Sequence, residues 1–392
     1  MEKYLVDVII LLAAAVVIVP LLQVARLGTV PGLVIAGILV GPTGFRLVEN
    51  IEEISRIAEL GVVFLLFVIG MELKPSRFWL MRRQVLGLGL LQIGVTSVIV
   101  AAICYGLFGM TLRLALLVGP ALALSSTAFV LQLLTEQGAL GTRHGRACFA
   151  VLIAQDLAVV PLLALVPLLA SPQLTIGQDL GIALLEAVVI MAIIIVGGRY
   201  LLHPVMQWIA DHAAPELVTA SAILLVLGTA MLTAKAGLSM ALGAFLAGLL
   251  IADSSYRHGV MREIEPFRGL LIGLFFMSMG LSLDGAQLAA RPLAVMGLVS
   301  GLVLIKAAVL WPLARFFQMK TTEAFAVALL LAQSGEFALA VFAVAKGRGL
   351  LPEPLFQQLL LVTLLSMLVT PLLAKVANRL VETRSGSDAA TP

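Results

Sequence analysis

Residues 32–41 read GLVIAGILVG, and residues 243–252 read GAFLAGLLIA, a second apolar stretch with glycines at matching places. Three further pairs lie at nearly the same distance along the chain: 69–73 with 279–283, 124–129 with 332–337, and Pro161 with Pro371. Any one match between apolar segments can arise by chance. Because four matches share one offset of about 210 residues, the sequence indicates an internal repeat of the kind that builds secondary transporters.

The composition places these stretches in a membrane. The chain has 392 residues, of which 61% are hydrophobic and 12% charged, whereas soluble domains are about 45–50% apolar and about 25% charged. Long apolar segments recur throughout, which indicates an all-α membrane protein; the strands of a membrane barrel would alternate instead. The two cysteines and four scattered histidines indicate neither a disulfide framework nor a metal centre. We therefore expect no cofactor, no enzymatic activity and no nucleic-acid partner.

A spanning helix needs about 20 mostly apolar residues, so we predict about 13 transmembrane helices. They cover roughly residues 5–24, 29–43, 57–73, 84–107, 112–134, 146–170, 177–200, 216–234, 237–252, 267–283, 292–314, 322–345 and 354–378. Matched helices are seven apart, so they run in opposite directions. This predicts an inverted-topology repeat of residues 1–170 and 216–380, joined by a linker helix at 177–200. Residues 1–380 form the transmembrane domain, and 381–392 a short cytoplasmic tail.

The loop charges predict the orientation. With the N-terminus outside, the inner loops hold sixteen Lys and Arg residues and the outer loops hold eight. Because basic residues are concentrated in cytoplasmic loops, we expect a multi-pass protein of the inner (plasma) membrane with the N-terminus outside and the C-terminus inside.

Three ionisable residues lie deep inside predicted spans. Asp156 is the only charged residue between Ala147 and Gln178, Lys306 the only one between Arg291 and Arg315, and Glu336 the only one between Glu323 and Lys346. Charged residues inside membrane spans are rare and usually functional. The alternative is a buried ion pair that merely holds helices together, and it weighs more for Lys306 and Glu336 than for Asp156.

Two polar clusters at repeat-related positions accompany these charges. They are Ser125, Ser126 and Thr127 in segment 112–134, and Gln333, Ser334 and Glu336 in segment 322–345. Small hydroxyl residues and glycine suit a helix interrupted at the midplane, where freed carbonyls can line a cation path. The alternative is ordinary packing of small residues between helices.

Asp156 with its neighbour Gln155 has the chemistry of a shared cation and proton site. Desolvation disfavours the charged form of a carboxylate, so such a side chain can hold a proton near neutral pH. Once deprotonated, it can bind a small monovalent cation through oxygen ligands. Since the two exclude each other, a site that crosses the membrane only when neutralised exchanges them obligatorily. Lys306 can pair with Asp156 in the empty site, which would oppose the effect of desolvation; which effect dominates stays open.

The motifs that carry these residues closely resemble the monovalent cation:proton antiporter-2 family, and among its subgroups the Kef-type potassium efflux antiporters. They are GxxxAGxLxGP at 32–42, ELGVVFLLFVIGMEL at 59–73, ALSSTAFVLQLL at 123–134, GRACFAVLIAQDLAVVPLLAL at 145–165, GAFLAGLLIADS at 243–254, IEPFRGLLIGLFFMSMGLSLD at 264–284 and AQSGEFALAVF at 332–342. The resemblance reaches to about residue 380.

The resemblance implies an antiporter fold in which two broken helices, here 112–134 and 322–345, cross beside the ion-binding carboxylate, here Asp156. It implies a homodimer with a dimerisation domain and an elevator-like core. Gln155 before Asp156 is the pattern associated with potassium/proton exchange, whereas sodium-transporting branches carry Asp-Asp or Asn-Asp. No GxGxxG follows the last predicted helix, so we expect a membrane domain without the nucleotide-binding regulatory domain, which a missing domain or ancillary subunit would supply.

We therefore expect a cation/proton antiporter that favours K⁺. In this hypothesis Asp156, Gln155, Ser125, Ser126 and Thr127 form the ion and proton site. Lys306 supplies a compensating charge, and Glu336, Gln333 and Ser334 support the second broken helix. The alternatives are a Na⁺/H⁺ antiporter, a channel-like K⁺ pathway without proton coupling, a symporter for an organic solute, and a regulatory membrane protein that binds ions without transport.

Overall fold

The computed structural model describes residues 2–25, 29–48, 51–72, 83–171, 189, 197–198, 200, 205, 207–209, 215–235, 240–252, 254, 257–283, 285 and 290–388. Their contacts define two compact units. Unit 1 comprises Met1–Ala15, Leu33–Arg77 and Leu163–Ser282, and unit 2 comprises Val16–Gly32, Phe78–Leu162 and Leu283–Pro392. Each unit is described by itself.

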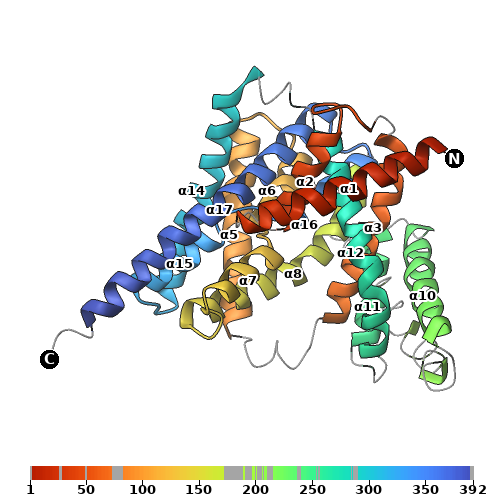
Figure 1. The fold of residues 1–392 in the computed structure, drawn as a ribbon. Coiled ribbons are helices and arrows are strands. Elements are labelled where there is room, and N and C mark those ends of the chain that lie inside the picture. Colours follow the sequence, from red (N-terminus) through yellow and green to blue (C-terminus); the bar gives the residue numbers. More distant parts are fainter. Residues whose placement is uncertain are drawn as a thin grey trace. The chain divides into compact units, whose positions relative to one another are not determined.

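The described secondary structure is helical (Figure 1). The elements are α1 (Glu2–Val24), α2 (Thr29–Val40), α3 (Ile51–Glu72), η1 (Gln84–Gly89), α5 (Leu90–Gly106), α6 (Leu112–Ala123), α7 (Thr127–Glu136), α8 (Arg143–Ala170), α10 (Pro215–Lys235), α11 (Met240–Ala252), α12 (Arg257–Leu281), α14 (Pro292–Phe316), α15 (Thr321–Leu330), α16 (Glu336–Gly347) and α17 (Glu353–Asp388). Helices suit a bilayer because each satisfies its own backbone hydrogen bonds.

Six of the described helices are long and apolar enough to cross a membrane, or seven when the bent α12 is counted. Four shorter apolar helices accompany them, namely α2, α6, α11 and α15. The prediction of a multi-pass, all-α membrane protein is confirmed. The predicted number of about 13 spans stays a prediction, and the predicted linker helix at 177–200 lies almost entirely outside the described residues.

Unit 1 holds the repeated glycine motifs, and they make matching contacts. A Cβ atom on Gly37 of α2 would collide with a backbone carbonyl of α12, and one on Gly280 of α12 would collide with a carbonyl of α2. The same reciprocal relation joins Gly70 of α3 and Gly248 of α11. Small residues let membrane helices approach backbone to backbone. The glycine repeat of the sequence is therefore a repeat of two close helix crossings.

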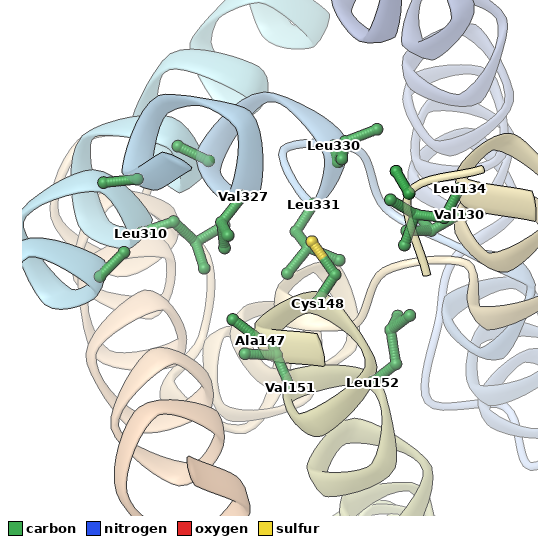
Figure 2. Packing of buried hydrophobic residues seen from close by; sticks show 14 of the residues in the cluster. Val130, Leu134, Ala147, Cys148, Val151, Leu152, Leu310, Val327, Leu330 and Leu331 are labelled. Atoms are coloured by element: carbon green, nitrogen blue, oxygen red, sulfur yellow. The ribbon is translucent and has the colours of Figure 1, made fainter. Parts of the chain in front are cut away.

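The core of unit 2 includes buried apolar side chains from α7, α8, α14 and α15. Figure 2 shows Cys148 and Val151 of α8 among leucines and valines of α7, α14 and α15. Cys148 is fully buried in this cluster and acts as a small apolar residue, as the sequence predicts. Leu330 and Leu331, where α15 ends, are both buried in it. This packing fixes the place at which α15 stops.

Two helix boundaries differ from the sequence prediction. Helix α12 begins at Arg257, ten residues before the predicted start at 267, because its first turns carry charged residues that a hydropathy argument assigns to a loop. Helix α17 runs on to Asp388, through most of the predicted tail at 381–392. Once a helix is formed, each added residue adds one backbone hydrogen bond, so a helix can continue beyond its apolar part.

Candidate functional site

Both predicted broken helices are broken, and the two breaks contact each other. Helix α6 ends at Ala123 and α7 begins at Thr127, with the backbone between them extended. Helix α15 ends at Leu330 and α16 begins at Glu336. Across the crossing, the Gly335 N–H donates to the Leu124 carbonyl at 3.0 Å, and the Ser125 hydroxyl donates to the Leu331 carbonyl at 2.8 Å.

The crossing leaves no room for a larger residue at Gly335. A Cβ atom there would collide with the Ser126 amide nitrogen and the backbone of Ser125. Gln333 adds a third link: in the amide orientation that matches donors with acceptors, its side-chain oxygen accepts from the Ser126 N–H at 2.9 Å. The two breaks thus form one hydrogen-bonded unit.

A buried lysine lies at this crossing. Lys306 of α14 is fully buried, and its Nζ donates to the Gln333 carbonyl at 2.6 Å and to the Ser125 hydroxyl at 3.0 Å. Carbonyl oxygens freed at the C-terminal end of a helix segment carry partial negative charge, so an ammonium is favourable there. Within the described residues, Lys306 donates to these two neutral oxygens, and its pairing with Asp156 stays a prediction.

The matching helix end in the first repeat is satisfied by two carboxamides. The Ala123 carbonyl at the end of α6 accepts from Gln92 Nε2 at 3.1 Å and from Gln155 Nε2 at 3.3 Å. Gln155 Nε2 also donates to Gln92 Oε1 at 2.7 Å. Both side chains are fully buried. A neutral pair of glutamines therefore binds the backbone at the end of α6, whereas Lys306 binds the backbone within the second break.

Gln92 is the residue that the sequence analysis missed. A usable signal exists: Gln92 and Thr96 are polar residues four apart in a long apolar helix, so they share one face. The structure joins them by a hydrogen bond of 3.2 Å and buries both fully. A polar pair on one face of a membrane helix indicates a buried network.

Gln155 faces the break and holds it. Its Oε1 accepts from the Ser125 N–H at 2.8 Å, while its Nε2 donates to the oxygens already described. Ser126 is likewise engaged, because its hydroxyl caps α7 by accepting from the Phe129 N–H at 3.2 Å. Gln155, Ser125 and Ser126 therefore use their polar atoms on the broken backbone.

Asp156 lies at the start of the second half-helix. Its Oδ1 accepts from the Thr127 hydroxyl at 2.7 Å, and Thr127 is the first residue of α7. Asp156 is only partly buried, unlike the fully buried Gln155 beside it. The N-terminus of a helix segment carries partial positive charge, which stabilises a nearby carboxylate. A carboxylate, a hydroxyl oxygen and a helix start thus meet at one partly accessible point.

The second broken helix repeats this arrangement with another carboxylate. Glu336 is the first residue of α16 and is buried, so its charge complements the start of that helix segment. The Ser334 N–H donates to the Ser366 hydroxyl at 3.0 Å, as the Ser125 N–H donates to Gln155. Ser366 stands about 210 residues after Asp156. The backbone scheme is therefore repeated, with the Ser366 hydroxyl in the role of the Gln155 amide oxygen, whereas the sequence offset places this neutral serine opposite Asp156.

This set of groups can hold a cation and a proton alternately. A deprotonated carboxylate and a hydroxyl oxygen are ligands suited to hard cations, and the same carboxylate can take a proton. The buried network around it holds the broken backbone in place through Gln155, Ser125 and Ser126. The predicted site residues on α7, α8, α14 and α16 are brought together in unit 2.

Comparisons with known proteins agree with this geometry. A family model described as "Sodium/hydrogen exchanger, transmembrane" matches residues 10–375. The glutathione-regulated potassium-efflux system protein KefC of Cronobacter sakazakii is 41% identical over 377 residues, which cover 96% of this chain and 61% of the relative. The chloroplastic K(+) efflux antiporter 2 of Arabidopsis thaliana is 44% identical over 382 residues, which cover 95% of this chain and 32% of the relative. The chain thus spans less than two thirds of these relatives.

A solved structure has the same fold. The sodium proton antiporter MjNhaP1 of Methanocaldococcus jannaschii superposes with a TM-score of 0.72 over 96% of this chain and 99% of the other, at 16% sequence identity. At that identity the likeness concerns the fold alone. The predicted antiporter-like membrane fold is confirmed.

Proposed function

The chain belongs to the sodium/hydrogen exchanger family, and from this premise we propose that it exchanges a monovalent cation, K⁺ in preference to Na⁺, for protons. The observation that carries the proposal is the contact between Asp156 and Thr127 at the start of α7, inside a chain of membrane helices. The resemblance to Kef-type antiporters drawn from the motifs is confirmed by the relatives reported above.

Asp156 is the shared site of cation and proton in this proposal. When the carboxylate is deprotonated, its oxygens and the Thr127 hydroxyl oxygen bind the cation. When a proton arrives, it neutralises the same carboxylate and releases the cation. Because Gln155 is neutral, one carboxylate exchanges one proton for one cation, provided that Lys306 keeps the same charge throughout the cycle. The exchange is then electroneutral.

The neighbouring residues hold the site in shape. Gln155, Ser125 and Ser126 bind the backbone at the first break, and Gln333 and Lys306 bind the second break to it. Glu336 and Ser334 support the start of the second segment. Ligating groups work best when a supporting shell fixes their positions. Among the predicted ligands, the Thr127 hydroxyl contacts the carboxylate directly.

The preference for K⁺ and the setting of the protein follow from its relatives and its loops. Two relatives are named for potassium efflux, and Gln155 before Asp156 fits that class. The distribution of basic residues supports an outside N-terminus and a cytoplasmic C-terminus in the plasma membrane. We infer a homodimer that works by alternating access, with rigid movement of one part of the molecule carrying the site across the bilayer.

Proton movement in liposomes tests the proposal. The purified chain is reconstituted with a pH-sensitive dye inside, and K⁺ or Na⁺ is added outside. Wild-type protein is expected to move protons in response to K⁺ at lower concentrations than Na⁺, and Asp156→Asn is expected to fall to the background rate. Glu353→Gln, which changes an exposed carboxylate at the start of α17, serves as the control and should exchange normally.

Three other results would change the proposal. Full exchange by Asp156→Asn would remove this carboxylate from the mechanism. A response to Na⁺ alone would leave a Na⁺/H⁺ antiporter. Potassium current without any proton movement would replace the antiporter by a channel-like pathway.

A further inference from the structure

Unit 2 contains an apolar cavity that the ion site does not use. It has a volume of about 310 Å³ and lies between α5, α6, α14 and α17. Side chains that line it include Val100, Ile103, Leu122, Leu298, Leu302 and Leu359. The only amide side chain in the lining is Gln358. Ordered water needs two to four polar partners, so the lining does not suit water.

Two glycines open the wall of this cavity on α14. Gly297 and Gly301 both line it, and a Cβ atom added to either would meet no heavy atom within 4 Å. They are one helical turn apart, so the gap follows the helix axis. Taking the roughly 30 Å³ of a water molecule as the size of one methylene group, the cavity has room for about ten such groups. Its apolar lining and its volume fit part of a hydrocarbon chain.

A basic residue lies at the end of α14 beyond these glycines. Arg291 is the exposed N-cap of α14, seven residues before the cavity residue Leu298. Seven residues of helix rise roughly 10 Å, so the Arg291 backbone lies about that far along the axis of α14 from Leu298. That places a guanidinium, which recognises phosphate well, near the end of α14 from which the cavity lining begins.

We propose that this cavity binds one acyl chain of an anionic phospholipid whose phosphate contacts Arg291. Moving a chain from bilayer to cavity exchanges one apolar surrounding for another, so the hydrophobic effect contributes little. Binding instead gains the dispersion contacts that an empty cavity lacks and the charge-assisted contact at Arg291. The headgroup, and not the chain, therefore decides which lipid binds.

The bound chain would reach the crossing of the broken helices. Leu122 lines the cavity and precedes Ala123, whose carbonyl accepts from Gln92 and Gln155. Ile305 lines it and precedes Lys306. An occupied cavity supports both α6 and α14 where they hold the breaks. The proposal thus adds a lipid site to the proposed transport function, but its binding test does not depend on transport.

Native mass spectrometry of the purified full chain tests this site. Dioleoyl phosphatidylglycerol and dioleoyl phosphatidylcholine are titrated separately, and the tightest adduct is followed. Wild-type protein is expected to bind one phosphatidylglycerol about tenfold more tightly than phosphatidylcholine, a ratio typical of one added polar contact. Gly301→Leu, which fills the cavity, should lose this adduct. Arg291→Gln should bind both lipids equally.

Matched variants distinguish the effect of filling the cavity from the effect of misfolding. Gly94→Leu makes the same change on α5 at a glycine that also has open space and does not line the cavity. It should bind phosphatidylglycerol as wild type does. Gly297→Leu fills the cavity at a second point and keeps the test valid if Gly301→Leu does not fold. Wild-type binding by both cavity-filling variants would overturn the acyl-chain site, and equal affinities of wild-type protein for both lipids would overturn the role of Arg291.

Discussion

At the scale of single residues, substitutions of Thr127 test whether a residue beside Asp156 binds the cation or only supports the site. Its hydroxyl contacts Asp156 at 2.7 Å, whereas the neighbouring hydroxyls bind backbone. We predict that Thr127→Val weakens apparent K⁺ affinity by about ten- to a hundredfold, because a hydrogen bond to a charged group contributes about 1.5–3 kcal/mol. Thr127→Ser keeps the oxygen and should stay within about twofold of wild type. Proton efflux measured against K⁺ concentration in liposomes decides, and equal affinities for the two variants would count against a ligand at this position.

A substitution of Gln92 tests whether the carboxamide pair holds the end of α6. Gln92→Leu removes the partner of Gln155 Nε2 and one donor to the Ala123 carbonyl. An unsatisfied buried polar group costs about 1–3 kcal/mol, so we predict a lower melting temperature together with slower exchange. Gln84→Leu makes the same substitution on half-buried η1 and should shift both readings far less. If Gln92→Leu melts and transports like wild type, the carboxamide pair does not hold the end of α6.

The charged site residues could be found from the sequence, and their partners could not. Asp156, Lys306 and Glu336 each stand alone in an apolar run, which marks them without any structure. The bonds of Gln155 depend on which residues of α5 face it, and that is decided by packing between helices. Lys306 shows the same limit, because its bonds to Ser125 and Gln333 depend on how α14 packs against the crossing.

At the scale of helices, the crossing of the breaks depends on Gly335. Its Cβ position is occupied by the backbone of Ser125 and Ser126, so Gly335→Ala must push the breaks apart. Overpacking of this kind costs about 1–3 kcal/mol, and we predict a clearly lower melting temperature and loss of exchange. Gly347→Ala at the end of α16, where a Cβ atom meets nothing within 4 Å, is the matched control. A normal melting temperature for Gly335→Ala would show that the crossing can widen.

Helix breaks were easier to predict than helix ends. Ser125, Ser126 and Thr127 in the first repeat and the Ser334-Gly335 pair in the second announce interruptions, because hydroxyl groups and glycine can replace helical hydrogen bonds. The charged beginning of α12 carries no apolar signal, so its start at Arg257 was missed. A helix that continues past its apolar part gains hydrogen bonds from propagation alone, and hydropathy does not detect that.

At the scale of the whole molecule, the repeated segments share close helix crossings but differ in where they carry a charged residue. Gly37 with Gly280 and Gly70 with Gly248 form matching crossings, yet Ser366 occupies the place that Asp156 has in the first repeat. A neutral counterpart leaves one titrating carboxylate at that position of the repeat. In the proposed mechanism, this asymmetry would leave Asp156 as the exchange site.

The orientation of the chain in the membrane is the remaining prediction at this scale. The loop after α5 and the loop after α7 are separated by one broken helix, so they must lie on opposite sides if that helix spans the bilayer. Leu107 is 76% exposed and Leu140 is 41% exposed, so a cysteine at either position can be labelled. The excess of basic residues places the Leu107 loop outside and the Leu140 loop inside.

In intact cells, with Cys104 and Cys148 replaced by alanine, a membrane-impermeant maleimide should label Leu107→Cys and spare Leu140→Cys until the cells are opened. The reverse pattern would invert the topology, and labelling of both in intact cells would mean that α6 and α7 do not together cross the membrane.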